Sequence, residues 1–453
     1  MPRRYSLQDS QSPSQPTPQP TQQPSHVNTR AFTRGMALLE DLEQQRRDKL
    51  ARFTTVRQEE PDEDADSNSP IYDAFLSTQG PEGIFSLTNF SPSEFDLLWA
   101  DLRHFVSKNW NVGSGRKSEV SARDLLLMML ASMKHCGNWD VVALVFSQKP
   151  PTFEKRVLGY IKAVHPFFMR SYVAQLAEQW SMKNLIASGN QFKNFPFARY
   201  ATDVTFQQTN TPCGSYAEKK HYYSGKHSLY GHKVEISVVP NGFAIFCTEH
   251  YKGSISDKTI FDENVDVHKA GLAKQQDETL LADPNREHTS WAVLADKGYQ
   301  GIQHEVRAVL PSKKPKGGIL TFEEQRRNDA IASDRVVVEN FFGRMKTLWA
   351  VCTDKYRWSR QNYDVIFQTG VALTNVHIRF HPLKDEDGDV NTQYINRLNA
   401  IGTKLIKDKR KASQKHKKKR KARLSMCLAG GISLAADHAG SDGSDTELES
   451  QLF

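Results

Sequence analysis

Three acidic residues occupy positions where a charge needs a partner or a metal ion. Asp203 lies in the middle of FARYATDVTFQQ (197–208), a β-branched and aromatic run that predicts a strand. Asp296 ends the short apolar run WAVLAD, which also predicts a strand. Glu339 is the one glutamate in AIASDRVVVENFFGRMKTLW (330–349), a largely apolar run typical of a helix. Together the three carboxylates form a candidate catalytic or ion-binding constellation.

Each of these residues also has an ordinary structural interpretation. On a helix Arg335 lies one turn before Glu339 and could neutralise it inside a core helix. An aspartate at the end of a strand is commonly a turn former or a helix cap. Lys346 lies two turns beyond Glu339, so Arg335, Glu339 and Lys346 share one helix face and the carboxylate lies among cations.

Five segments in this order resemble the catalytic domain of DDE transposases, specifically the PIF/Harbinger-like group: DVT, YYSGKHSLYGHK, GSISD, LADKGY and RVVVENFFGRMK. The resemblance covers about 195–382, and its R-x₃-E-x₆-K pattern, formed by Arg335, Glu339 and Lys346, is specific. It implies an RNase H-like fold, two divalent ions, and cleavage and joining of DNA strands. Related bacterial transposases often carry a tyrosine where this chain has Ala332, so a role of that tyrosine in holding DNA does not carry over.

Under this resemblance Asp203, Asp296 and Glu339 are predicted to be the catalytic residues and the metal ligands. Asp203 would bridge two Mg²⁺ or Mn²⁺ ions, which hard carboxylate oxygens prefer, and Asp296 and Glu339 would each bind one of them. Asp257 in GSISD is the rival of Asp296. We prefer Asp296 because a strand-end carboxylate would lie beside Asp203, whereas Asp257 can serve as the cap of the next helix.

Several cations near these segments are predicted to contact DNA. Arg335 and Lys346 would lie beside the phosphate, and Lys346 is the better candidate for substrate DNA. The segment KKHYYSGKHSLYGHK (219–233) interleaves cations, including Lys226 and Lys233, with tyrosines that could stack on an unpaired base. Its histidines do not have the spacing of a zinc finger or a zincin.

The pattern before the catalytic domain predicts helices. Two helical segments flank SQKPP (147–151) in the layout of a helix-turn-helix, and the second carries Lys155 and Arg156 near its start, where a recognition helix meets bases and phosphates. The same layout is common in bundles that touch no DNA. With the transposase resemblance we predict that this helical segment binds double-stranded DNA by itself.

The predicted fold is α/β: an RNase H-like mixed sheet preceded by an all-α, helix-turn-helix-like domain, with disordered termini. Within the sheet we expect a hairpin of 228–239 and 243–251 and a short strand at 308–311. The predicted organisation is 1–30 disordered, 31–70 a helix and acidic linker, 71–190 the helical domain, 195–382 the catalytic domain, and 383–453 a basic then acidic disordered tail.

Composition fits this organisation. The 453 residues carry 60 Lys and Arg against 52 Asp and Glu, and the segment 404–423 alone holds twelve of the cations. That segment predicts a nuclear localisation signal or a nonspecific DNA-binding arm. The five cysteines lie far apart, which favours neither a zinc module nor a disulfide scaffold. We expect neither a membrane span nor a secretory signal.

Two functions of different class follow. The first is a nuclear, metal-dependent DNA endonuclease and transposase acting on double-stranded DNA, with the terminal repeats of its element as the expected substrate. The second is a host-adopted, catalytically silent DNA-binding protein. We leave open whether the chain forms a homo-oligomer and whether a second element-encoded DNA-binding protein is required.

Overall fold

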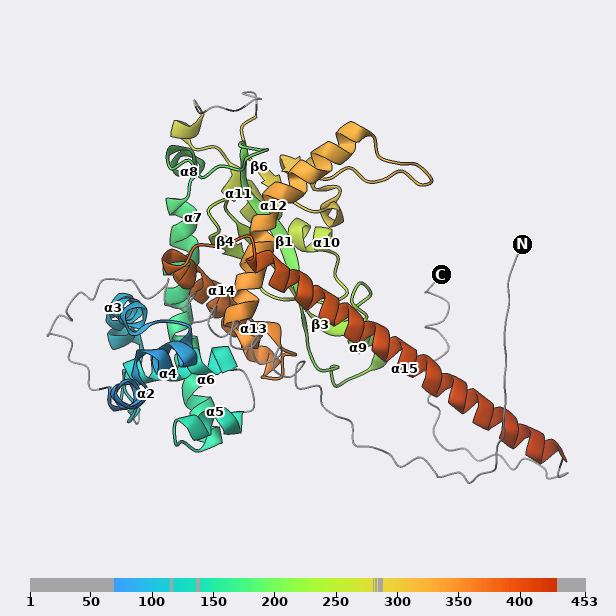
Figure 1. Cartoon of the computed structure of the whole chain (residues 1–453), viewed down its shortest axis with the longest axis horizontal. Helices are drawn as coiled ribbons and strands as arrows, with labels where there is room; N and C mark the ends of the chain where they lie inside the picture. The colour runs from blue at the N-terminus through green and yellow to red at the C-terminus, as the bar shows by residue number, and fades with distance from the viewer. Residues whose placement is uncertain are drawn as a thin grey trace, which may run out of the picture. The chain divides into compact units, whose positions relative to one another are not determined.

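The computed structural model describes residues 69–429 except 115, 116, 136–138, 280, 282 and 284–287, and the side chains of 427–429 are not described (Figure 1). The predictions for 1–68 and 430–453 lie outside these residues. None of the described helices is long and apolar enough to cross a membrane.

Helices fill the region before the sheet, as the pattern predicted. The capping box at Ser91 is present, because its side chain accepts from the Glu94 backbone N–H while the Glu94 carboxylate accepts from Ser91. The apolar run of α4 is buried along most of its length. Gly80, with φ +68°, kinks α2. The helices are α2 (Pro70–Thr88), α3 (Pro92–Asn109), α4 (Ala122–His135), α5 (Trp139–Val145), α6 (Pro150–Met169), the π-helix η1 (Arg170–Ala174), α7 (Gln175–Gln179) and α8 (Met182–Ala187).

A mixed sheet follows, with β1 at its centre. β1 (Ala198–Gln208) pairs antiparallel with β3 (Leu229–Val238) and parallel with β6 (Ala292–Leu294). The long second strand of the predicted hairpin is split into two short strands that both pair with β3. The architecture is a mixed α/β fold that is consistent with an RNase H-like domain. The remaining strands are β2 (Tyr223–Ser224), β4 (Ala244–Cys247), β5 (Tyr251–Lys252) and β7 (Ala308–Val309), in the order β2-β3-β1-β6-β7 with β4 and β5 on β3.

Helices cover the sheet and end the domain. Thr321 and Glu324 form the capping box that opens α12 (Phe322–Leu348), the long helix that carries Glu339. The predicted cap of the helix after GSIS is wrong: Ser256 is the N-cap, and Asp257 is the first residue of α10. The other helices are α9 (Tyr216–Tyr222), α10 (Asp257–Glu263), α11 (Val265–Leu272), α13 (Ala350–Thr353), α14 (Tyr363–Phe380) and α15 (Asp387–Ala429), with 3-10 turns η2 (Gln276–Glu278), η3 (Lys297–Tyr299), η4 (Ile302–His304) and η5 (Arg360–Asn362).

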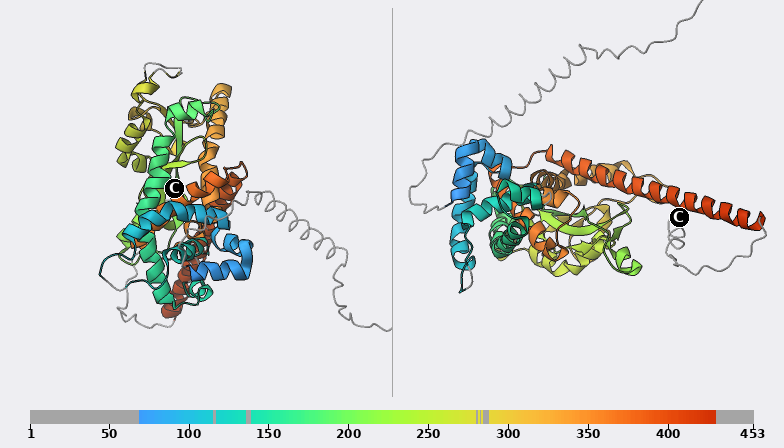
Figure 2. Two further views of the ribbon diagram at one scale, coloured as in Figure 1. Left: turned by 90° about the vertical axis from the view of Figure 1, so that its left-hand side faces the viewer. Right: turned by 90° about the horizontal axis from the view of Figure 1, so that it is seen from below.

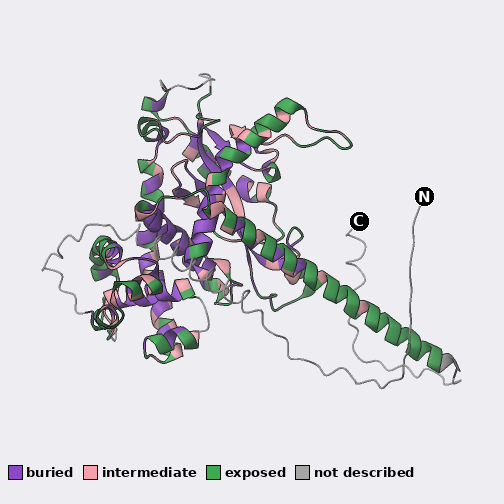
Figure 3. Cartoon of the chain, viewed as in Figure 1, coloured by how far each residue is buried: buried purple, intermediate pink, exposed green. Residues whose placement is uncertain are grey.

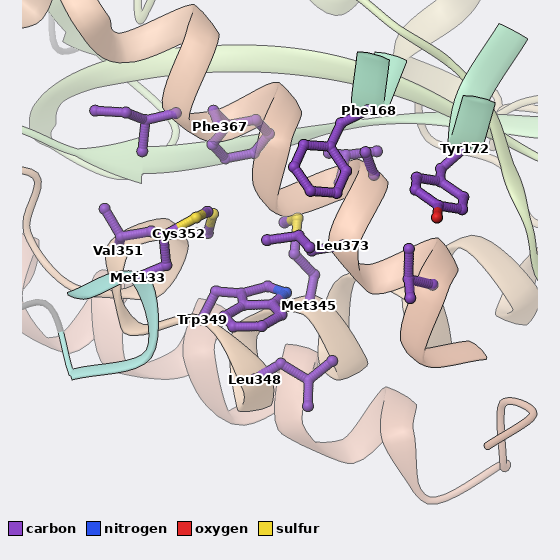
Figure 4. Packing of buried hydrophobic residues seen from close by; sticks show 14 of the residues in the cluster. Met133, Phe168, Tyr172, Met345, Leu348, Trp349, Val351, Cys352, Phe367 and Leu373 are labelled. Carbon is purple, nitrogen blue, oxygen red and sulfur yellow. The ribbon is translucent and has the colours of Figure 1, made fainter. Parts of the chain in front are cut away.

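The helical region before β1 and the region of the sheet share one hydrophobic core. Figure 4 shows Met133, Phe168 and Tyr172 of the helical region packed beside Trp349 and Leu373. The prediction of a separate helical domain therefore needs correction: α4 and α6 lie against α13 and α14 and bury apolar surface with them.

The segment after 382 is not a disordered tail throughout. Residues Asp387–Ala429 form α15, whose first half lies on α12 with Tyr394 and Leu398 buried (Figure 3). These two side chains are one helical turn apart, so they lie on one face of α15 and form a cluster with Phe206 and Leu229. The sequence-based expectation overlooked this apolar spacing because the neighbouring charge is so high.

Candidate active site

The sheet brings Asp203 and Asp296 to the same level. β1 and β6 are parallel, and Ala201 of β1 is paired with Leu294 of β6. Each aspartate lies two residues beyond its member of this pair, and side chains two residues apart point to the same face. The backbone register therefore places both carboxylates side by side, Asp203 near the middle of β1 and Asp296 just past the carboxyl end of β6.

Arg335 of α12 joins the three predicted carboxylates. Its Nη2 lies 3.2 Å from Asp203 Oδ2 and 4.0 Å from Glu339 Oε1, and its Nη1 lies 3.7 Å from Asp296 Oδ1. Because the first two oxygens share one nitrogen neighbour, they lie within about 7 Å of each other, a separation that metal-bridged carboxylates can have. Arg335 thus does more than neutralise Glu339 within α12, because it also contacts Asp203 and Asp296.

The site is buried at its centre and open at its edge. The Arg335 side chain is 8% exposed, while those of Asp203, Asp296 and Glu339 are 23%, 37% and 39% exposed. Burial raises the pKa of Asp203, against the lowering effect of Arg335, and the nearby Asp296 and Asp257 raise it further. Burial likewise raises the pKa of Glu339, with smaller contributions from Asp203 and Asp296. One guanidinium does not fully offset three carboxylates.

The donor set fits a hard divalent cation by its chemistry. Three carboxylates that converge on one guanidinium, two of them with raised pKa values, are oxygen ligands of the kind that Mg²⁺ and Mn²⁺ select. As they are arranged here, however, no three His, Cys, Asp or Glu side chains among the described residues form a metal-binding group. The Arg335 guanidinium takes the central position and acts as the counter-cation.

Asp257 borders the site from α10. Its Oδ1 accepts from Lys233 Nζ at 2.9 Å, and a Cβ on Gly298 would lie 3.1 Å from its Oδ2. The LADKGY loop therefore passes close to Asp257, and a glycine fits that approach. The structure does not present Lys233 to a DNA strand as predicted, because its ammonium is also bonded to the Ile255 carbonyl and is largely buried.

Lys346 also lies elsewhere than predicted. Its side chain is buried beneath α15, where Nζ bonds to Asn391 Oδ1 and lies 4.1 Å from the centre of the Tyr394 ring. Burial lowers the pKa of Lys346 to about 7. The structure therefore corrects the expectation that this lysine holds substrate DNA, because α15, in a segment predicted to be a disordered tail, covers it.

The remaining predicted DNA contacts lie outside this cluster. Lys226 is exposed on the turn between β2 and β3. The two helices of the predicted helix-turn-helix are present as α5 and α6, with Lys155 exposed and Arg156 bonded to Gln148 across the turn. Sequence reasoning missed Asn391 and Tyr394, which the spacing of Tyr394 and Leu398 could have indicated.

The carboxylate cluster falls inside a recognised family segment. Residues 202–375 match the model of the family described as DDE superfamily endonuclease. This match contains Asp203, Asp296, Arg335 and Glu339, and it ends before α15. A probable transposase for the insertion sequence element IS702 of Microchaete diplosiphon is 31% identical over 157 residues, which is 34% of this chain and 48% of that relative.

The chain thus spans about half the length of the curated relative that it matches. No solved structure matches it. The two matches support a DDE transposase-type domain over 202–375, and they do not distinguish the PIF/Harbinger-like group from other DDE groups.

Proposed function

We propose that this chain is a DNA endonuclease and strand transferase of the DDE transposase type, of the PIF/Harbinger-like group. The observation that carries the proposal is the convergence of Asp203, Asp296 and Glu339 on Arg335 from two strands and a helix. A purely structural ion pair would need one carboxylate. Three carboxylates around one guanidinium, two of them with raised pKa values, favour a site that binds additional positive charge.

The chain's own residues prepare that site. Asp203, Asp296 and Glu339 would hold two Mg²⁺ or Mn²⁺ ions, which when bound supply an activated attacking oxygen and a stabilised leaving oxygen for phosphodiester cleavage and joining. Arg335 keeps the three carboxylates together while cations are absent and reduces their mutual repulsion. Its guanidinium is then the nearest protein cation for a DNA phosphate that enters the open edge.

Substrate and location follow from the resemblance and from charge. The expected substrate is double-stranded DNA carrying the terminal repeats of a mobile element, since the relative is described as a transposase of an insertion element. Exposed Lys155 on α6 and exposed Lys226 on the turn between β2 and β3 are candidate phosphate contacts. The basic segment 404–423 could direct the chain to the nucleus.

Plasmid nicking with Mg²⁺ or Mn²⁺ tests the proposal. Asp203→Asn, Asp296→Asn and Glu339→Gln should each lower nicking by at least about a thousandfold, because each removes a charged ligand. Glu323→Gln, an exposed glutamate at the start of the same helix, is the matched control and should keep wild-type nicking. Asp257→Asn should retain substantial nicking if Asp296, as we propose, is the second ligand.

The silent DNA-binding alternative has a separate signature. If the wild-type chain and all five variants bind duplex DNA with the same affinity and none of the six proteins nicks it, the chain is that silent DNA-binding protein. Nicking that persists in the three carboxylate variants would instead reveal a contaminating nuclease.

A further inference from the structure

The first half of α15 is seated on the catalytic region by two close backbone contacts. A Cβ on Gly343 of α12 would lie 1.6 Å from the Asp387 carbonyl oxygen, and a Cβ on Gly402 of α15 would lie 2.1 Å from the His227 carbonyl oxygen. Between these contacts the Tyr394 hydroxyl donates to the Phe206 carbonyl at 2.8 Å. Any larger side chain at either glycine would push the helices apart, so the direction of α15 is fixed relative to β1.

The second half of α15 has a different character. From 404 to 423 it carries twelve lysines and arginines and one acid, Asp408, and nearly all of these described side chains are exposed. The cations lie on every side of the helix rather than on one stripe. Figures 1 and 2 show this half continuing away from the catalytic region as the same helix. We call residues 404–423 the basic arm.

The basic arm lacks the usual sources of helix stability. Lys407, Lys411, Lys415 and Lys419 follow one another at intervals of four residues, where like charges repel. The exposed side chains of the arm form no apolar stripe that other elements cover. A polyanion alongside would replace this repulsion with attraction, and duplex DNA carries about one negative charge per 1.7 Å of its axis.

We propose that the basic arm lies along duplex DNA and holds the part of the duplex that continues beyond the active site. This deepens the proposed function and rests on it for the position of the cut. At 1.5 Å per residue the arm is about 30 Å long and begins about 15 Å beyond Tyr394, which touches β1 three residues after Asp203. It therefore spans about nine base pairs of a duplex that lies alongside it.

Salt dependence of duplex binding is the first test. The full-length Lys411→Gln, Lys415→Gln, Lys418→Gln triple variant should lower the slope of log K against log salt concentration by about two to three, because each phosphate contact contributes about 0.9. The control triple variant neutralises exposed cations elsewhere, Arg103→Gln, Lys108→Gln and Lys193→Gln, and should change the slope by less than about one. Equal slopes for the two triple variants would overturn the proposal.

Protection from trypsin is the second test, and it separates DNA from an import receptor. Trypsin cuts after Lys and Arg, so the arm offers twelve sites. A 30-base-pair duplex should slow cleavage within the arm at least tenfold in the wild-type chain. If the duplex binds but leaves the arm as sensitive as before, the arm is a transport signal or a solvated tail. Both tests run without divalent cations, so failure of the nuclease proposal leaves their outcome readable.

A third test asks whether the fixed direction of α15 matters for DNA binding. It loosens the contact of α15 with the rest of the protein without changing the charge of the helix. Gly402→Val should speed hydrogen exchange across 391–402 and weaken binding of the same duplex about tenfold, since the arm and the body then bind as loosely linked parts. The salt slope should stay the same, because every cation remains. Ala412→Val, at an exposed position of the same helix, is the control. If the two valine variants bind the duplex with equal affinity, the close contact of Gly402 with His227 does not direct the basic arm.

Discussion

The two ends of one face of α12 have opposite environments. Arg335 lies among three carboxylates at the open edge of the sheet. Lys346, three turns along, lies under α15 between an amide and an aromatic ring. Helical periodicity correctly predicts that both cations share a face, yet only the packing of a helix from about 45 residues later decides which of them can meet a substrate.

This difference shows that the groups around a cation determine what the cation can bind. The carboxylates around Arg335 stabilise its positive charge, so the guanidinium can bind carboxylate or phosphate oxygens. The apolar cover over Lys346 instead lowers its pKa to about 7, so this lysine is a poor permanent cation near neutral pH.

The largest effect is expected from removing the cover. Gly343→Val should lower the free energy of unfolding by about 3 kcal/mol, because its side chain would overlap the Asp387 carbonyl at the start of α15. Urea unfolding measures this change. Gly225→Val is the control for the change of residue type, since a Cβ on Gly225 would meet nothing within 4 Å. Equal losses at both glycines would show that the α12–α15 contact is not tight.

A smaller effect is expected at the carboxylate cluster. Arg335→Gln in the absence of divalent cations should lower the free energy of unfolding by about 2 kcal/mol, a value reduced for the partial exposure of the three acids. Added Mg²⁺ should restore more stability to this variant than to the wild-type chain, because cations replace the missing charge. Thermal unfolding with and without Mg²⁺ provides the comparison, and an equal Mg²⁺ effect on both proteins would contradict the cation-site assignment.

Neutralising Lys346 should raise the free energy of unfolding near pH 7 by about 1 kcal/mol, whereas the two preceding substitutions should lower it. Its folded-state pKa is lowered from 10.5 to about 7, so the unfolded chain binds more protons between these values and stability rises with pH across them. Lys346→Met removes the charge but keeps the stem, so it should stabilise the protein near pH 7 and flatten this alkaline rise. Nicking should fall less than about tenfold. A loss as large as that of Glu339→Gln would mean that α15 moves aside for DNA.

The pH dependence of the acids should be weakest. Burial raises the pKa of Asp203 and Glu339 above 3.8 and 4.5, so their favourable contribution is complete below these values and is lost as the pH rises through the raised range. The double variant Asp203→Asn, Glu339→Gln should therefore gain stability relative to wild type between about pH 4 and pH 7. Urea midpoints in a chelator measure the gain. A gain toward low pH instead would show that these carboxyl pKa values are lowered.

Local patterns predicted much of the fold, and they failed where distant segments meet. The strand around Asp203, the capping boxes at Ser91 and Thr321, and the helix of Glu339 all depend on neighbours within a few residues. The cover over Lys346 depends on Tyr394 and Asn391, whose apolar and polar spacing is weak beside the charge of 404–423. Lys233 looks like a phosphate contact until the position of Asp257 is known.

The three carboxylates of the candidate site could be predicted from the sequence, whereas the central position of Arg335 could be predicted only in part. Asp203, Asp296 and Glu339 could be chosen because each is an acid in an apolar setting. Arg335 could be placed near Glu339 by helical spacing, but its contacts with both aspartates depend on how α12 crosses β1 and β6. Strand register, which no local pattern fixes, sets Asp296 level with Asp203.

The shared core has a consequence for the inheritance of this protein. Asn375 of α14 donates through its side chain to the carbonyl oxygens of Tyr172 and Ala244, so one buried amide joins the helical region to the sheet. Cutting the chain near residue 190 would strip α4 and α6 of their apolar partners on α13 and α14. Recombination at that point with a gene whose core residues differ would therefore yield misfolded chimeras, so the helical region and the sheet must diversify together.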